Sequence, residues 1–400
     1  MALMPVDDAL ARILDGVKPM PCETIKLDKA LGRMLAKDVV AKRSQPPFAA
    51  SAMDGYAVRH TDVAKVPARL RIIGASNAGH AFRGEVKAGT AVRILTGAAV
   101  PKGADTVIIQ ENTERDGNTL HVIHDTPKGK NIRRAGLDFT KGDVLVSAGT
   151  TLRPRDIGLL AAGNAPRVTV RKRPRIAIFT TGDELVLPGQ KARPDQIYSS
   201  NSHALEAMAR SLGCDVLNLG IVKDSPAATR AAIRKGLDAD VLVTTGGASV
   251  GDHDYVQEAL KSCGVNISFW KVALRPGKPF MHGRKGRTHV MGLPGNPVSA
   301  LVTARIFLVP LLRALNAIPT GESYALARLT VPLPHNDERR DYIRATLSDA
   351  PDGVREVAPF NLQDSSMQRT LRQSDALILR APFAPALPAG SLVQVLIIDF

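Results

Sequence analysis

The stretch that decides the expected fold is Val241-Leu-Val-Thr-Thr-Gly-Gly-Ala-Ser-Val-Gly-Asp-His-Asp254. Its opening run of apolar and β-branched residues, ended by two glycines, is typical of a buried strand of an α/β sheet whose carboxyl end opens into a glycine loop. Ligands bind at that end of such sheets. Gly246 and Gly247 allow a ligand to approach the backbone, and hydroxyls such as that of Ser249 suit a phosphate or another oxyanion.

Two carboxylates close the same loop. Asp252 and Asp254 would repel an anionic ligand unless a divalent metal lay between them, so the loop suggests a metal-bridged phosphate. A second interpretation also fits these residues: a tight turn from strand to helix, with Asp254 as the helix cap. The local sequence does not decide between the two.

Strands and helices alternate around this stretch. Such alternation predicts a parallel sheet with right-handed crossovers, which gathers the loops that follow successive strands along one rim. Glu184, Asp224 and the Gly246 loop are therefore expected within reach of one another. The expected elements are strands at 175–179, 215–222, 289–291 and from Val241, and helices at 201–213, 226–237 and from Pro297.

Two further loops carry groups that suit an anion. Asn296 is expected to cap the helix that starts at Pro297, whose free N–H groups would face a ligand. Lys271, Arg275 and Lys278 surround two prolines, and a guanidinium together with ammonium groups suits a tetrahedral oxyanion. A solvated basic turn is the alternative for this second loop.

The flanking segments are expected to be mostly β. Short strands between glycine turns from 66 to 146 predict a small all-β domain, and short strands from 321 onward predict a final β-barrel or sandwich. Asp54, which precedes a glycine, is by itself a turn residue. Helices are expected at 3–17, at about 28–36 and at 156–163, and the basic residues 167–175 are expected to form a linker.

Composition narrows the class of protein. A chain of 400 residues has room for several domains. The net charge of +15 attracts anions without choosing among phosphates, nucleotides, nucleic acids and acidic proteins, while an aromatic content of 4% argues against a binder of single-stranded nucleic acid. Three cysteines without a C-x-x-C spacing indicate a reducing compartment and no zinc site.

Neither a targeting segment nor a membrane span is expected. The amino terminus carries Asp7 and Asp8, and the longest apolar stretch, residues 301–315, is interrupted by Arg305 and Arg313. A soluble, cytoplasmic protein is therefore predicted. The phosphate-binding P-loop, the dinucleotide fingerprint and the H-E-x-x-H zinc motif are all missing.

Six motifs, taken in order, resemble the molybdopterin molybdenumtransferase family, the MoeA-like molybdenum insertases. Each motif is weak alone, but a chance match would have to reproduce both the residues and their order. The resemblance covers nearly the whole chain. The motifs are Ser-Ala-Met-Asp-Gly-Tyr-Ala-Val at 51–58, the loop 96–105, Thr-Gly-Asp-Glu-Leu at 181–185, Thr-Gly-Gly-Ala-Ser-Val-Gly-Asp at 245–252, Pro-Gly-Lys-Pro at 276–279 and Leu-Pro-Gly-Asn-Pro-Val-Ser at 293–299.

The resemblance implies a multidomain α/β plus β fold in a homodimer whose active sites are shared between subunits. The central three-layer α/β domain would have a mostly parallel sheet and bind molybdopterin. The implied domains are an N-terminal helical and extended linker domain at 1–45 and 133–170, a small β domain at 46–132, the α/β domain at 171–320 and a C-terminal β-barrel-like domain at 321–400.

The resemblance also implies a reaction, in which adenylylated molybdopterin and molybdate give molybdenum cofactor and AMP with Mg²⁺. By motif, the implied catalytic residues are Asp54, Thr96, Asp138, Glu184, Asp224 and Asp254. The metal would be held by Glu184, Asp224, Asp252 and Asp254. The substrates would be bound by Thr181, Gly182, Gly246, Gly247, Ser249, Lys271, Arg275, Lys278, Pro279, Pro294, Asn296, Pro297, Arg344, Ser365 and Ser366.

Two departures and several alternatives accompany this reading. Leu137 stands where the family often has Glu, which weakens the assignment of Asp138, and Arg275 stands where Lys is frequent. A molybdopterin adenylyltransferase, itself an expected partner, would lack the flanking β domains. A non-catalytic molybdopterin carrier or scaffold of the same fold is the alternative function, and a nucleic-acid binder would rest on the charge alone; we expect neither nucleic acid nor membrane as a partner.

Overall fold

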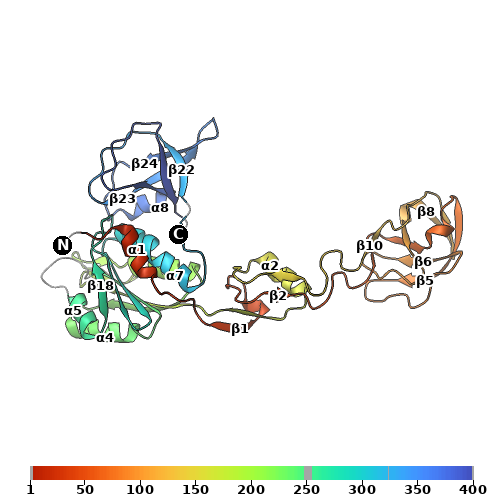
Figure 1. Cartoon of the computed structure of the whole chain (residues 1–400), viewed down its shortest axis with the longest axis horizontal. Helices are drawn as coiled ribbons and strands as arrows, with labels where there is room; N and C mark the ends of the chain where they lie inside the picture. Colours follow the sequence, from red (N-terminus) through yellow and green to blue (C-terminus); the bar gives the residue numbers. More distant parts are fainter. Residues whose placement is uncertain (1–2, 247–254, 323, 399–400) are drawn as a thin grey trace. The chain divides into compact units, whose positions relative to one another are not determined.

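The computed structural model describes residues 3–246, 255–322 and 324–398, which form two compact units (Figure 1). One unit joins Met1–Glu23 to Arg171–Phe400, and the other is Thr24–Val170. Each unit is described by itself below.

A six-stranded sheet forms the centre of the larger unit. Its order is β16-β13-β17-β21-β20-β18, in which the first four strands run parallel and β20 is antiparallel to both of its neighbours, β21 and β18. All residues of β17 are buried, as expected for a strand covered on both faces. The strands are β13 (Arg175–Thr181), β16 (Asp215–Val222), β17 (Val241–Thr245), β18 (Asn266–Trp270), β20 (Met281–Lys285) and β21 (Thr288–Leu293).

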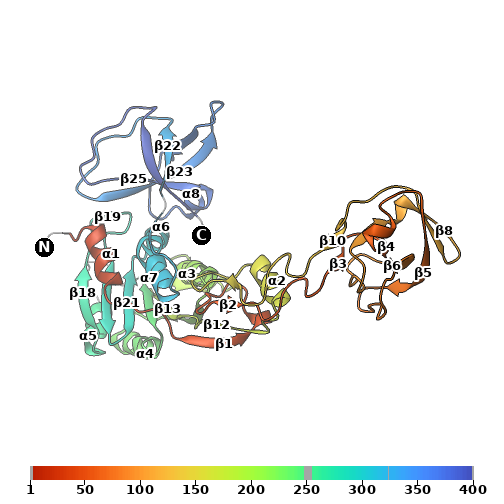
Figure 2. The same ribbon diagram turned by 45° about the vertical axis from the view of Figure 1, so that its right-hand side comes forward.

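Helices cover both faces of this sheet (Figure 2). Successive residues of β13 point to opposite faces: Ile176 and Ile178 join a core with residues of α1, α3, α6 and α7, whereas Ala177 and Phe179 join a core with residues of α4 and α5. The predicted three-layer α/β domain is confirmed. The helices are α1 (Val6–Leu14), α3 (Asn201–Ser211), α4 (Pro226–Gly236), α5 (Tyr255–Ser262), α6 (Pro297–Thr303) and α7 (Val309–Leu315).

Helices α6 and α7 are continuous through a π-helical turn at Ala304–Leu308. The resulting 19-residue helix, Pro297–Leu315, is long and apolar enough to cross a membrane, yet 83% of its most apolar window is buried inside the protein. Its apolar residues are accounted for by the core, where Phe307 stacks on Phe280 with ring centres 4.5 Å apart.

The C-terminal segment closes into a five-stranded barrel, because β23 pairs with both β24 and β25. The two-residue strand β19 adds to β23 from outside and links the barrel to the α/β domain. The elements are β19 (Leu274–Arg275), β22 (Tyr324–Leu329), β23 (Arg340–Asp349), β24 (Arg355–Pro359), α8 (Gln368–Gln373), β25 (Ala376–Arg380) and β26 (Leu392–Ile397). The predicted barrel is thereby confirmed.

The described residues of the smaller unit form three hydrophobic clusters. Two involve a six-stranded sheet of order β7-β4-β6-β5-β9-β8, and the third lies among helix α2 and short strand pairs. Its elements are β1 (Cys22–Lys26), β2 (Val39–Val40), β3 (Ala50–Ser51), β4 (Gly55–Val58), β5 (Ala68–Ser76), β6 (Thr90–Ile94), β7 (Thr106–Ile109), β8 (Thr113–Asp116), β9 (Thr119–Val122), β10 (Ile132–Arg133), β11 (Val144–Val146), α2 (Pro154–Ala162) and β12 (Arg167–Arg171).

Two expectations from the sequence are wrong in this part of the chain. Residues 28–36 are not a helix: only Leu27–Lys29 forms a 3-10 turn, and Gly32 then adopts a φ of +73°, which ends any helical path. Residues 167–171 are not a linker but strand β12, which pairs with β1 and buries Val168 and Val170 between charged residues. In the larger unit, the first helix is shorter than the predicted 3–17, because α1 spans Val6–Leu14.

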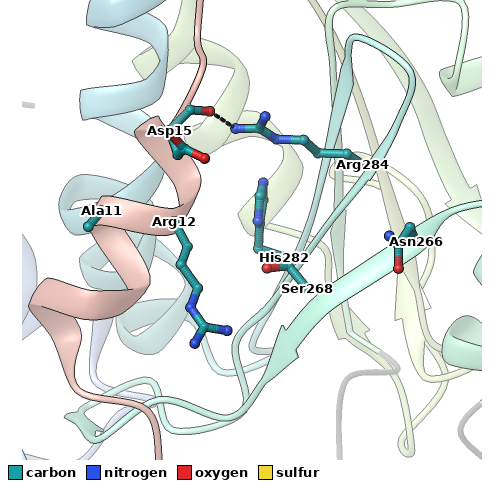
Figure 3. Close-up of a pocket in the computed structure, with 7 residues that line it drawn as sticks. All are labelled: Ala11, Arg12, Asp15, Asn266, Ser268, His282 and Arg284. Carbon is teal, nitrogen blue, oxygen red and sulfur yellow. Dashed lines mark hydrogen bonds between the residues drawn. The ribbon is translucent and has the colours of Figure 1, made fainter.

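Two buried histidines lie near helix α1 at the antiparallel side of the sheet. His282 Nε2 lies 3.2 Å from His289 Nδ1, and the two residues are 1% and 4% exposed. Arg284 donates hydrogen bonds to the carbonyl oxygens of Ile13 and Asp15 at the end of α1, beside a cavity of about 540 Å³ (Figure 3). Burial lowers the pKa of His282 to about 3 and that of His289 to about 4, and the charge of Arg284 adds to both shifts.

These lowered pKa values predict an acid-sensitive unit. Because an unfolded histidine has a pKa of about 6.5, the unfolded state binds more protons than the folded state between about pH 6.5 and 4. The free energy of unfolding should therefore decrease as the pH is lowered through this window. Each histidine contributes up to about 1.4 kcal/mol of this decrease per pH unit. We expect the His282→Gln/His289→Gln double variant to show a flatter dependence of Tm on pH. If Tm depended on pH as steeply in the double variant as in the unchanged chain, the two histidines would not be the source of the acid sensitivity.

Candidate functional site

A cavity of about 400 Å³ lies where the parallel strands of the larger unit end. Because parallel strands carry their carboxyl ends to the same edge, loops far apart in sequence meet there. The strand pair β14 (Leu185–Val186) and β15 (Ile197–Tyr198) forms one wall. The cavity is lined by Thr180, Thr181, Glu184, Leu185, Ile197, Tyr198, Ser199, Ser200, Asn201, Gly246, Gly295, Asn296, Pro297, Ser366 and Gln368.

Buried hydroxyls without a hydrogen-bond partner gather at this edge of the sheet. Thr180 Oγ1, Thr181 Oγ1 and Ser199 Oγ belong to residues that line the cavity, and Thr244 Oγ1 lies at the end of β17; none has a partner among the residues that the structure describes. An unsatisfied buried polar group costs about 1–3 kcal/mol, and native proteins keep few of them. A cluster at one strand edge therefore indicates a surface that a polar ligand completes.

Two glycines allow the loops to approach this closely. Gly246 has a φ of +86°, and a Cβ there would lie 2.4 Å from the carbonyl oxygen of Thr181. A Cβ on Gly182 would lie 2.6 Å from a carboxylate oxygen of Glu184. At Gly246 the backbone of Thr181 occupies the space that a larger residue would need. At Gly182 the Glu184 carboxylate could move aside, and the φ of +149° is what disfavours a larger residue.

Three carboxylates from two loops form an acidic group beside the cavity. The backbone N–H of Asp224 donates to Asp183 Oδ1 over 3.3 Å. Burial raises the pKa of Asp224, and the negative charges of Asp183 and Glu184 contribute to the rise. The structure therefore brings the loops after β13 and β16 together, as the sheet topology predicts.

Only two of the four predicted metal ligands lie among the residues that the structure describes. Within residues 3–246, 255–322 and 324–398, no group of three His, Cys, Asp or Glu side chains is arranged to hold a metal. Asp252 and Asp254, together with Gly247 and Ser249, lie outside the described residues. The carboxylates that remain are Glu184 and Asp224.

The barrel contributes a serine loop to the cavity. Asn296 Nδ2 donates to Ser365 Oγ over 2.8 Å, and the N–H of Val298 donates to the carbonyl oxygen of Ser365 over 3.0 Å. Ser366 lines the cavity, and its hydroxyl donates to Asp364. The predicted positions are confirmed, since Asn296 is the N-cap and Pro297 begins the helix, but the Asn296 side chain bonds to the barrel and not to the helix.

Arg344 lies buried close to this serine loop. Its side chain is 1% exposed, Nε donates to Gln363 Oε1 over 3.2 Å, and Nη2 has no partner among the described residues. Burial lowers the pKa of Arg344, although the nearby Asp364 opposes this shift. A cation with an unused donor suits an anionic ligand.

Arg275 differs from Arg344 because its guanidinium is already hydrogen-bonded to acidic side chains. Its guanidinium donates to Asp341 and Asp337 and to Asn336 Oδ1, at 3.0 Å for each of the last two. The hydrogen bond to Asp341 raises the pKa of Arg275. The group that we expected to be a free cation thus fastens β19 to the barrel.

The other predicted residues of the basic loop stand outside the cavity lining. The backbone N–H of Lys271 donates to Phe280, and the carbonyl oxygen of Lys278 accepts from Val272. Pro279 follows Lys278 in the same turn, and the carbonyl oxygen of Pro294 accepts the hydroxyl of Thr245 over 2.9 Å.

Asp54, Thr96 and Asp138 belong to the smaller unit. Asp54 Oδ1 accepts hydrogen bonds from the backbone N–H and the hydroxyl of Thr96, at 2.7 and 2.8 Å, and these bonds lower the pKa of Asp54. The backbone N–H of Asp138 donates to the carbonyl oxygen of Gln45. Asp54 and Thr96 therefore form one group.

Comparisons with known proteins agree on one family. Three family models match successive parts of the chain: "MoeA N-terminal region (domain I and II)" at residues 4–163, "Probable molybdopterin binding domain" at 177–314 and "MoeA C-terminal region (domain IV)" at 326–398. The molybdopterin molybdenumtransferase of Haemophilus influenzae is 34% identical over 399 residues, 98% of either chain. The chain belongs to the molybdopterin molybdenumtransferase family.

Further similarities support this membership and confirm the resemblance that the motifs suggested. The molybdopterin molybdenumtransferase of a Nostoc species is 38% identical over 335 residues, which cover 81% of this chain and 77% of that one. A crystal structure of a molybdopterin biosynthesis MoeA protein from Pyrococcus horikoshii has 29% identity and a TM-score of 0.83, with 99% of both chains covered. The multidomain α/β plus β fold is thus shared with a solved member of the family.

The sequence analysis did not identify several residues in or beside the cavity of this chain. Asp183, which belongs to the acidic group beside the cavity, lies inside a quoted motif, and its acidic side chain was the available signal. Ser199 and Asn201 precede and begin a helix that was predicted, so a search of that turn for polar residues would have found them. Gln368 of α8 donates to Ser200 Oγ over 2.6 Å, and no sequence pattern marks it.

The close approach at Gly246 gives a test of this cavity. We expect Gly246→Ala to weaken molybdopterin binding at least tenfold and to lower Tm, because the new Cβ meets Thr181. Gly390→Ala is the matched control, since Gly390 has a φ of +85° and no atom within 4 Å of a Cβ. Both variants carry a left-handed backbone cost of about 1–2 kcal/mol. Equal effects of the two on Tm and on molybdopterin binding, measured by calorimetry, would show that the contact has no role.

Proposed function

We propose that this chain inserts molybdate into adenylylated molybdopterin, which gives molybdenum cofactor and AMP. Membership of the molybdopterin molybdenumtransferase family and the names of its relatives assign it to molybdenum cofactor biosynthesis as a transferase. The adenylylated form of the substrate, the need for Mg²⁺, a homodimer with shared sites and a cytoplasmic location belong to our proposal. So do the four domain boundaries and the roles of individual residues.

The observation that carries the proposal is the cluster of unpartnered hydroxyls at the end of the parallel strands. Thr180, Thr181, Ser199 and Thr244 all lie within the part of the chain that matches the molybdopterin-binding family model. Hydroxyl groups accept and donate hydrogen bonds, so they suit both the phosphate and the polar ring of a pterin. This edge is where we place adenylylated molybdopterin.

The acidic group fits magnesium shared with a substrate phosphate. Mg²⁺ is usually bound through one or two carboxylates together with phosphate oxygens, rather than by an all-protein cage. Glu184 and Asp224 would hold it, with Asp252 and Asp254 as further proposed ligands. When bound, the ion would neutralise the phosphate and the carboxylates and stabilise negative charge on the leaving AMP.

The remaining polar groups would position molybdate next to the pterin. Arg344 offers a buried cation with an unused donor, and Ser366 offers a hydroxyl at the cavity wall. Lys278 would add charge, while Arg275 would contribute only if its acidic partners released it. Holding two anions in reacting geometry is itself a large source of rate.

The proposal is tested by AMP release from purified protein given adenylylated molybdopterin, molybdate and Mg²⁺. We expect AMP and active cofactor only when all three are present. Tight molybdopterin binding without AMP release would move the protein to the class of carriers or scaffolds. A protein that binds no molybdopterin would contradict the proposal altogether.

The shared site predicts complementation between two inactive variants. Asp54→Ala should leave Tm unchanged and reduce AMP release at least tenfold, as should Glu184→Ala, because the proposal places both carboxylates at the site. A mixed dimer of the two variants would contain one intact site, formed by the smaller unit of one chain and the larger unit of the other. We therefore expect partial recovery of AMP release on mixing.

Asp116→Ala serves as the control, because Asp116 is exposed in the β8–β9 hairpin. It should release AMP at the rate of the unchanged chain. Full activity of Asp54→Ala would make its loop structural, and a mixed dimer without recovery would argue against sites shared between subunits.

A further inference from the structure

Asn201 is a buried polar residue of the cavity for which neither a motif nor a family match gives a role. It is the first residue of α3, is 7% exposed and lines the cavity. Its Nδ2 donates to the carbonyl oxygen of Gly295 over 2.7 Å and to Thr245 Oγ1 over 3.0 Å. One side-chain amide thus ties the start of α3 to the end of β17 and to the turn before α6.

The neighbours of Asn201 fix the orientation of its amide. The hydroxyl of Thr245 uses its single proton to donate to the carbonyl oxygen of Pro294 over 2.9 Å, so toward Asn201 it can only accept. The carbonyl oxygen of Gly295 is also only an acceptor. Rotating the amide by 180° would place Oδ1 against two acceptors, so the nitrogen must face them.

The opposite end of this amide is its oxygen. Asn201 Oδ1 accepts no hydrogen bond from any residue in the described ranges 3–246, 255–322 and 324–398. Since the residue lines the cavity, the locked nitrogen leaves the oxygen as the group available to a ligand. A ligand group that meets it must donate a hydrogen bond.

We propose that Asn201 is a specificity-determining residue whose Oδ1 accepts an N–H from the pterin ring of the substrate. This inference rests on the proposed function. The 2-amino-4-oxopyrimidine edge of a pterin presents a ring N–H beside an amino group. These two adjacent donors match the acceptor that the Asn201 amide offers. Asn201, Thr245 and Gly295 all lie within the segment that matches the molybdopterin-binding family model, which favours the pterin over the nucleotide as the group they meet.

A fixed acceptor is more selective than a mobile one. An amide free to rotate could present its NH₂ group to a ligand that lacks donors, whereas a locked amide cannot. Sites built to hydrogen-bond a particular group strongly reject analogues without it, because their own buried polar atom is then left unpaired. Asn201 is therefore expected to select its ligand in two ways: through the hydrogen bond that Oδ1 accepts, and through the fixed orientation of the amide.

The test compares molybdopterin with AMP on the full chain by titration calorimetry. Asn201→Ala should weaken molybdopterin binding at least tenfold and leave AMP binding within twofold. Thr245→Val keeps the shape but removes the hydroxyl, so it should weaken molybdopterin binding less. The double variant should bind no more weakly than Asn201→Ala, because the lock acts only through Asn201.

A methylated ligand separates contact from structural support. The unchanged chain should bind pterin more tightly than 3-methylpterin, and Asn201→Ala should bind the two alike. Asn218→Ala is the control, since the side chain of Asn218 donates to Glu206 and is not part of the cavity lining. It should match the unchanged chain in every titration.

Each result decides between distinct failures. If the unchanged chain binds no molybdopterin, the proposed function fails. If it binds molybdopterin but Asn201→Ala binds it equally well, only the role of Asn201 fails. Equal loss of molybdopterin and AMP binding, or continued discrimination against 3-methylpterin in Asn201→Ala, would overturn the inference in favour of a purely structural residue.

Discussion

The common edge at which β16, β13, β17 and β21 end is the constraint on which the cavity depends. The register places Thr181 beside Val222 and sets Thr245 beside both Thr180 and Leu293. The residues that follow these strands therefore emerge level with one another. Loops separated by more than a hundred residues can meet without long connections, and short loops keep their polar groups in fixed positions.

Threonine serves this edge in two ways. Its β-branched side chain packs well in a strand, and its hydroxyl brings a polar group into a core that is otherwise apolar. Thr245 satisfies its hydroxyl through Pro294 and Asn201, whereas Thr180, Thr181 and Thr244 have no such partner in the described chain. The edge thus combines a rigid, satisfied frame with groups left for a ligand, which is the arrangement expected of a preorganised binding site.

Local periodicity predicted much of the fold but failed where charge or tertiary contact dominated. The strands β13, β16 and β17 and the helices α3 and α4 were recognisable because apolar residues repeat with the period of each element. In β12, the flanking arginines concealed the alternation of Val168 and Val170. The contribution of Gln368 from α8 was beyond prediction, because it depends on how the barrel packs against α3.

The two arginines expected at the molybdate pocket show why a list of cations does not define an anion site. In sequence, Arg275 and Arg344 are equivalent positive charges. In the structure, two carboxylates neutralise Arg275, whereas Arg344 is held by Gln363 and the carbonyl oxygen of Met367 with no carboxylate bonded to it among the described residues. Asp364 and Asp341 offset part of the cost of burying Arg344, but its hydrogen-bond partners are neutral. A buried cation bonded only to neutral groups is costly, and an incoming oxyanion would relieve that cost. Of these two arginines, Arg344 is therefore the one whose burial an oxyanion would relieve.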